Sequence, residues 1–215
     1  MIQEILQTNN KGIGKDTFVP GVQFMDAMIK HDTPLHHSYK PLAQQLYENF
    51  PEAKNILEVG CGGGNLAFFY KNFNPKATYV TLDINNQIVP EGLVSPDFHF
   101  TVWTDQPYQI TKDGKNIKFD LVVSYEHFEH IKTENIKPFL LNIKNHIHKN
   151  STVVATASLI SPGSHPHLTV WRKEKWEEIL VDNGFKMLPK QILTPESTPG
   201  NFSFINSTEL IFTLK

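Results

Sequence analysis

A glycine cluster between Asn55 and Leu66 constrains the fold of this chain more than any other feature of its sequence. The stretch reads N-I-L-E-V-G-C-G-G-G-N-L. Its short apolar run with β-branched members is typical of a buried parallel strand, and the glycines interrupt that run at once. Glycines at such a turn let the backbone approach another group closely, because side chains would block the approach. An apolar pattern compatible with a helix resumes at Leu66, so the stretch predicts a strand, a glycine loop and a helix N-terminus, the arrangement of a nucleotide-cofactor site.

The spacing of these glycines indicates which cofactor to expect. The dinucleotide fingerprint G-x-G-x-x-G would need a third glycine at position 65, where the chain has Asn65. The pattern present is E-x-G-x-G-x-G, which resembles the first motif of the class I S-adenosylmethionine-dependent methyltransferases. The alternative is a glycine-rich turn that binds no ligand. The resemblance implies that S-adenosyl-L-methionine is the cofactor and that the motif residues contact it: Glu58, Gly60, Cys61, Gly62 and Gly64.

Composition argues against several other classes of partner without excluding them. The 215 residues, 40% of them hydrophobic, are enough to bury one core, so we expect one domain with extensions. A formal charge of −2 makes nucleic acid unlikely, and the lack of a leader or an apolar run of spanning length predicts no membrane partner. The single cysteine, Cys61, cannot form an internal disulfide, which predicts a cytoplasmic location. As a nucleophile it would need a paired base, and the loop supplies none.

A second strand, predicted over 77–83, ends in an acid about twenty residues beyond the glycines. A carboxylate at this place in a nucleotide-binding βαβ unit accepts hydrogen bonds from the two ribose hydroxyls. We therefore expect Asp83, with Ile84 beside it, to bind the cofactor. The alternative is that Asp83 only caps the next helix.

A third strand is predicted over 98–103. In the family that the motif resembles, the turn after this strand holds the adenine ring, and an acid commonly reaches the adenine amino group. The resemblance thus implies that Asp105 binds the adenine and that Trp103 or Thr104 lines the ring. Alternatively, Trp103 belongs to the core and Asp105 starts a turn toward Pro107.

The fourth predicted strand, Phe119 to Ser124, runs into the segment Y-E-H-F-E-H-I. Ligands of open α/β sheets bind outside the carboxyl ends of the strands, so Ser124 to His130 should face the reaction centre, with Ser124 at the cofactor. Helical spacing would also permit a metal site. Family members with a histidine-rich segment here often use no metal, and we expect none. The side chains that a metal would use are Glu126, His127, Glu129 and His130.

The rest of the chain completes the pattern. A helix is predicted over 136–147, a fifth strand over 152–157, a helix over 171–183, and strands over 187–193 and 208–214. The loop after the fifth strand carries His165 and His167, which should lie on the same face as the reaction centre. The segment 194–207 is either a lid over the acceptor or a plain surface loop.

The resemblance covers roughly residues 40 to 215 and implies an α/β fold. We expect a Rossmann-like seven-stranded sheet of order 3-2-1-4-5-7-6, with helices on both faces. Residues 41–215 would form the methyltransferase domain and residues 1–40 an N-terminal helical cap, in which Ile2, Ile5 and Leu6 form one amphipathic turn.

The cofactor's chemistry sets the expected mechanism. A sulfonium makes its methyl group electrophilic, so the protein must hold an acceptor in line with the S–CH₃ bond and exclude water. We expect O-methylation of a small molecule or a sugar hydroxyl, with a histidine as general base. The alternatives are N-methylation of a small amine or protein, and a non-catalytic binding or scaffold protein; the acceptor's identity and the oligomeric state stay open. The candidate bases are His127, His130, His165 and His167.

Overall fold

The computed structural model describes residues 4–7, 39–84, 96–160, 167–193 and 207–215. Within them a seven-stranded sheet has the order β4-β3-β2-β7-β8-β10-β9. In the order of the sheet, its strands are β4 (Phe98–Thr101), β3 (Thr78–Asp83), β2 (Asn55–Val59), β7 (Phe119–Ser124), β8 (Ile147–Ser158), β10 (Ser207–Leu214) and β9 (Phe185–Met187).

This topology confirms the predicted order 3-2-1-4-5-7-6 when these strands are numbered along the chain. The pairs from β4 to β8 are parallel, while β10 is antiparallel to both β8 and β9. Strand β2 lies between β3 and β7, so the order of the strands changes direction at the carboxyl end of β2. Such a switch point opens a crevice in which ligands of α/β sheets bind.

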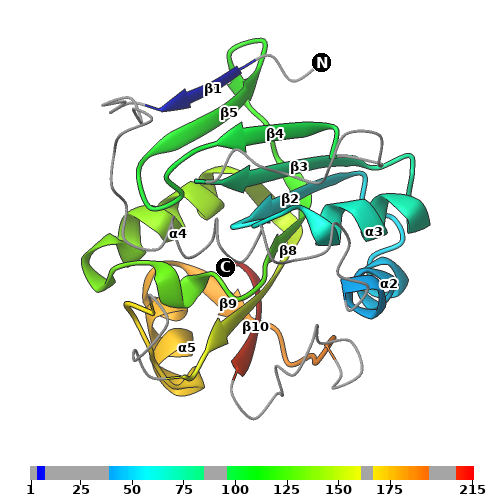
Figure 1. Ribbon diagram of the computed structural model, residues 1–215. Helices are drawn as coiled ribbons and strands as arrows, with labels where there is room; N and C mark the ends of the chain where they lie inside the picture. Colours follow the sequence, from blue (N-terminus) through cyan, green and yellow to red (C-terminus); the bar gives the residue numbers. More distant parts are fainter. Residues whose placement is uncertain (1–3, 8–38, 85–95, 161–166, 194–206) are drawn as a thin grey trace.

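Helices cover both faces of the sheet, as predicted. Figure 1 shows α2 (Tyr39–Asn49) and α3 (Asn65–Phe73) on one side, and α4 (Ile136–Asn145) and α5 (Lys173–Asp182) on the other. Successive side chains of β2 point to opposite faces: Ile56 packs in the core beneath α2 and α3, and Leu57 in the core beneath α4 and α5. The sheet is therefore buried on both faces, and this explains the continuous apolar run at β2.

A second sheet corrects the prediction for the N-terminus. Residues Glu4–Gln7 form β1, which pairs antiparallel with β5 (Tyr108–Lys112), so that Ile5 lies opposite Ile110. Strand β5 pairs in turn with β6 (Lys115–Asn116). The helical turn expected at Ile5 and Leu6 is wrong, because one isolated turn has little stability and the edge of β5 offers backbone hydrogen bonds. The rest of the predicted helical cap lies outside the described residues, apart from its last two positions, which open α2.

Smaller differences occur at element ends. The helix predicted over 136–147 ends at Asn145, and β8 begins at Ile147, earlier than predicted. The strand predicted over 187–193 is wrong except at Met187, because β9 covers Phe185–Met187 and residues 188–193 form no strand. The segment 194–207 lies outside the described residues except for Ser207. Among the described residues, no helix combines the length and the apolar character needed to cross a membrane.

Candidate active site

The glycine loop leaves β2 with its three motif glycines in left-handed backbone conformations. The φ angle is +77° at Gly60, +52° at Gly62 and +76° at Gly64. Residues with a Cβ rarely adopt this conformation, so the alternating glycines are required by the turn itself. The N–H groups of Gly60 and Cys61 both donate to the carbonyl of Leu82, at 2.8 and 3.1 Å, which fixes the loop against the end of β3.

The structure brings Asp83 to this loop. Its Oδ2 accepts a hydrogen bond of 2.8 Å from the N–H of Gly62, and the residue is only 5% exposed. The bond orients the carboxylate across the loop, and the partly buried Ile84 follows it. Helix α3 begins immediately after Gly64, so the partial positive charge of its N-terminus lies at the same edge of the sheet.

His127 packs directly beneath Gly60, a contact that sequence reasoning missed. A Cβ at Gly60 would lie 2.8 Å from the Cβ of His127 and still closer to its ring. The ring's Nε2 lies 2.8 Å from Oγ1 of Thr104, at hydrogen-bond distance. Burial is the main cause that lowers the pKa of His127 to about 3, and the neighbouring His130 has a smaller effect in the same direction. His127 is therefore neutral at pH 7. Its side chain joins the glycine loop to the turn after β4. Because it is buried in these contacts and has a low pKa, it is the weakest of the described candidates for the general base.

Asn142 of α4 holds the turn in which the adenine ring was expected. Its Nδ2 donates to the carbonyls of Thr104 and Gln106, at 3.0 and 2.7 Å. The residue is 3% exposed. Sequence reasoning missed it, although a polar residue between two apolar positions of an amphipathic helix was an available signal.

Asp105 and Trp103 flank this turn. Oδ2 of Asp105 accepts a hydrogen bond of 2.7 Å from Nδ2 of Asn135, and Trp103 is partly buried. Their contacts with an adenine ring stay a prediction.

Three further predicted cofactor residues, Ser124, Glu58 and Cys61, are buried in the loop or beside it. Oγ of Ser124 donates to the carbonyl of Val59 at 3.0 Å, which ties the ends of β7 and β2 together. Burial raises the pKa of Glu58 to about 8, and burial also raises the pKa of the Cys61 thiol. The thiol is therefore protonated at neutral pH and is no candidate nucleophile.

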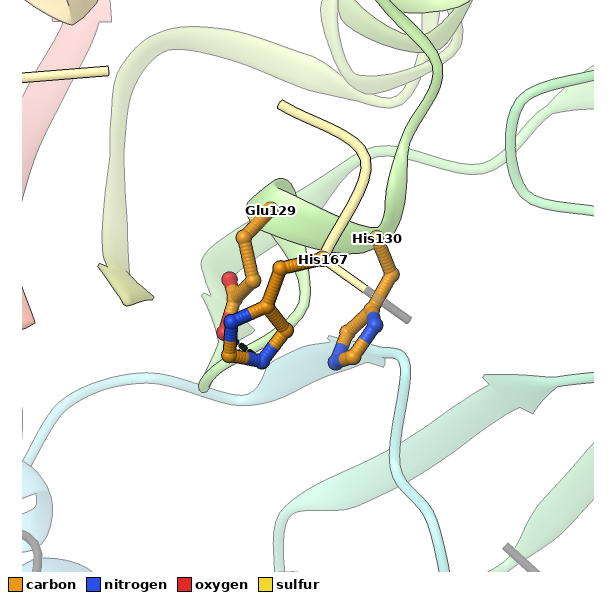
Figure 2. A group of neighbouring side chains, drawn as sticks. All are labelled: Glu129, His130 and His167. Atoms are coloured by element: carbon orange, nitrogen blue, oxygen red, sulfur yellow. Dashed lines mark ion pairs between the residues drawn. The ribbon is translucent and has the colours of Figure 1, made fainter. Parts of the chain in front are cut away.

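Glu129, His130 and His167 converge at the carboxyl end of β7. Glu129 and His130 belong to the 3₁₀ turn η1 (Phe128–His130), and His167 precedes α5. Figure 2 shows the three side chains pointing the same way, with Nε2 of His167 4.0 Å from Oε1 of Glu129. The rings of His130 and His167 are 5.0 Å apart between centroids. Burial is the main cause that raises the pKa of Glu129 to about 8, and the negative charge of Glu126 has a smaller effect in the same direction.

Backbone hydrogen bonds dock the His167 segment onto η1. The N–H groups of Leu168 and Thr169 both donate to the carbonyl of Glu129, at 2.7 and 3.0 Å. Oγ1 of Thr169 also donates to the carbonyl of Ile131 at 2.7 Å. The positions of Glu129 and His167 are therefore fixed relative to each other by the main chain.

The predicted set of histidines is thus divided. A continuous helix after Tyr125 would have placed His127 and His130 on one face. Instead Glu126 has a φ of +47° and only Phe128–His130 is helical, so His127 lies under Gly60 while His130 meets His167. His165 lies outside the described residues.

Comparisons with known proteins agree with this geometry. Residues 57–153 match the family model described as "Methyltransferase domain". The fold is similar to an S-adenosylmethionine-dependent methyltransferase from Clostridium acetobutylicum, with a TM-score of 0.60 and 14% identity over 90% of this chain and 97% of that one. It is also similar to magnesium protoporphyrin IX methyltransferase from Synechocystis with bound SAH, with a TM-score of 0.61 and 14% identity over 90% of this chain and 94% of that one.

A glycopeptide N-methyltransferase complexed with S-adenosyl-L-methionine gives a TM-score of 0.57 at 10% identity, over 82% of this chain and 94% of that one. At these identities the likeness is one of fold. No curated protein matches the chain. The family match spans the glycine loop, Asp83 and β7, and the sheet has the order that the loop's motif implies. Residues 57–153 therefore match a methyltransferase domain, and the described chain has the fold of S-adenosylmethionine-dependent methyltransferases.

Proposed function

We propose that this protein transfers the methyl group of S-adenosyl-L-methionine to a hydroxyl group of a small molecule or a sugar. The observation that carries the hydroxyl acceptor is the meeting of His130 and His167 beside Glu129, at the carboxyl end of β7. A hydroxyl must lose its proton as the methyl group arrives, so it needs a basic site. A neutral amine is already nucleophilic and needs such a site less.

The cofactor would bind along the glycine loop. Main-chain glycines allow its close approach, and Asp83 is held by Gly62 with its carboxylate at the end of β3, where a ribose would present two hydroxyl donors. The turn of Thr104, tied down by Asn142 and His127, would then support the adenine.

The acceptor would enter beside the cluster of Glu129, His130 and His167. The cluster lies close to the cofactor loop, because His127 contacts Gly60 and its ring centroid is 6.4 Å from that of His130. In-line transfer forms the O–CH₃ bond as the S–CH₃ bond breaks, and the hydroxyl proton passes to the cluster. A cytoplasmic location for this reaction stays a prediction.

The cofactor half is tested by calorimetric titration with S-adenosylhomocysteine. Asp83→Asn should weaken binding by about 10- to 150-fold, since a hydrogen bond to a charged group contributes about 1.5–3 kcal/mol. Asp120→Asn is the matched control, because Asp120 accepts from Lys54 and Asn55 at the other end of the strands. Absence of binding at millimolar ligand, or equal affinity of the Asp83→Asn variant, would contradict the proposal.

The acceptor half is tested by following S-adenosylhomocysteine production with a panel of phenols, sugars and amines. His130→Ala and His167→Ala should slow hydroxyl methylation by about 10²- to 10⁴-fold, the range for general acid–base catalysis, while leaving cofactor affinity unchanged. Products methylated only on nitrogen would overturn the hydroxyl assignment.

A further inference from the structure

Glu129 has a buried carboxyl group without the hydrogen bonds that such a group requires. The residue is 0% exposed, and within the described part of the chain its oxygens make no hydrogen bond of normal geometry; the backbone N–H groups of Glu129 itself and of Ser158 lie near them and only partly offset the effect of burial on its pKa. In the same part of the described chain, Oε1 of the nearby Glu126 is a third buried carboxyl oxygen without a hydrogen bond of normal geometry. Burying a carboxylate is costly unless a positive charge or several donors compensate it. The carboxyl group must therefore either stay protonated or meet a positive charge, such as a bound cation.

His167 does not offer Glu129 a hydrogen when its ring is neutral. Its Nδ1 donates to the carbonyl of Ile160 at 3.0 Å, which makes Nε2 the nitrogen with the lone pair. That lone pair and Oε1 of Glu129 lie 4.0 Å apart, farther than a hydrogen bond. Metal-binding histidines typically donate one ring N–H to a backbone carbonyl or carboxylate and bind the ion through the other nitrogen.

The three side chains are close enough to share one ion. Their ligand atoms lie within 4.8 Å of one another. Ligands bonded at about 2.0–2.2 Å stand roughly 3–4 Å apart around an ion, so a change of about 1 Å at the widest pair would close the shell. The backbone bonds from Leu168 and Thr169 to Glu129 hold two of the three in register before any ion arrives.

We propose that Glu129, His130 and His167 form a binding site for a divalent transition-metal ion at the acceptor end of the active site. The role that we give to the ion rests on the proposed hydroxyl acceptor, whereas the choice of its three ligands does not. Of the four residues considered from the sequence, Glu129 and His130 remain. His127 is turned toward Gly60, Glu126 does not belong to the group, and His167 joins it.

The ligand set selects the class of ion. Two imidazole nitrogens with one carboxylate oxygen suit Zn²⁺, Fe²⁺, Co²⁺ or Mn²⁺, whereas Mg²⁺ and Ca²⁺ prefer oxygen ligands alone. Three protein ligands leave coordination positions open for another molecule.

The acceptor's hydroxyl oxygen would occupy an open position. Coordination lowers the pKa of the hydroxyl, which releases its proton to solvent. The bound oxygen then forms the O–CH₃ bond with the cofactor's methyl group, the C–S bond breaks, and S-adenosylhomocysteine is released. In this arrangement His130 and His167 bind the ion and do not act as general bases. The ion, in their place, makes the hydroxyl easier to deprotonate.

The test uses the full chain, freed of metal with a chelator and then desalted. Co²⁺ is titrated by calorimetry and by its visible absorption, and Zn²⁺ is added as a competitor. We expect one equivalent of Co²⁺ to bind and Zn²⁺ to displace it. Glu129→Gln and His167→Ala should each weaken binding by about tenfold or more. His148→Ala, which removes a partly exposed histidine that contacts Asp120, should leave Co²⁺ binding unchanged.

Titration of the same samples with S-adenosylhomocysteine separates the two proposals and shows whether each variant is folded. Cofactor binding without stoichiometric Co²⁺ binding would overturn the metal site and leave the proposed function standing. Metal binding without cofactor binding would overturn the proposed function and leave the metal site standing. Co²⁺ affinity unchanged in both folded variants would also overturn the site.

Discussion

Replacing Gly60 by alanine tests the contact between the glycine loop and His127. An alanine at φ +77° would cost about 1–2 kcal/mol in backbone strain alone. Its Cβ would also displace the ring of His127, which would lose its contact with Thr104 and leave a buried polar atom unpaired. Such an unpaired group costs about 1–3 kcal/mol, so Gly60→Ala should lower the free energy of unfolding by about 2–5 kcal/mol.

Gly114→Ala provides a matched control. Gly114 has nearly the same φ, +72°, but no atom lies within 4 Å of the position that its Cβ would take. It should therefore lose only the backbone term of about 1–2 kcal/mol. Urea unfolding of both variants without cofactor, followed by tryptophan fluorescence, measures the difference.

A double mutant completes the experiment. If His127 causes the additional loss, Gly60→Ala with His127→Ala should be more stable than the sum of the single effects predicts, by about 1–3 kcal/mol. Equal losses for Gly60→Ala and Gly114→Ala, or strictly additive effects in the double mutant, would refute the reasoning.

Two further predictions concern α4. His146 is fully buried, accepts a hydrogen bond from the N–H of Ile110, and burial lowers its pKa from 6.5 to about 4. The unfolded chain therefore binds this proton first as pH falls, so about 3 kcal/mol of stability (about 2.5 pH units at 1.36 kcal/mol each) is lost between pH 6.5 and 4. Urea midpoints across this range should fall less steeply in His146→Gln, and equal slopes would show that His146 does not titrate this way. Asn142→Leu leaves one buried and one partly buried carbonyl without their donor and should cost about 2–3 kcal/mol while weakening S-adenosylhomocysteine binding. Calorimetry and urea unfolding check both effects, and unaltered cofactor affinity would separate this turn from the cofactor site.

The main sheet could be predicted because its signals are local. The apolar run of β2, the glycines after it and the acid that ends β3 each carry their meaning within a few residues, and parallel topology follows from strands that alternate with helices. The strand β1 could not be predicted in this way. Its four residues have no strong preference of their own, and their conformation depends on pairing with β5, far along the chain.

The site was predictable in its residue types more than in its arrangement. The sequence indicated that histidines after β7 and β8 would face the reaction centre, and two of them lie side by side at the carboxyl end of β7. It could not show that Glu126 takes a left-handed conformation, which divides His127 from His130. Nor could it show that Asn142 is buried against carbonyls of the turn after β4, since that contact exists only once α4 packs on the sheet.

The docking of His167 onto Glu129 has a consequence for how relatives of this chain can diverge. The segment recognised as the shared methyltransferase domain ends at residue 153, so it includes Glu129 and His130 but not His167. His167 reaches them from a later segment that Leu168 and Thr169 attach through main-chain hydrogen bonds, which do not depend on side-chain identity. The residue at position 167 can therefore change without disturbing the docking, and in the proposed acceptor site such a change would alter the acceptor chemistry while leaving the glycine loop as it is.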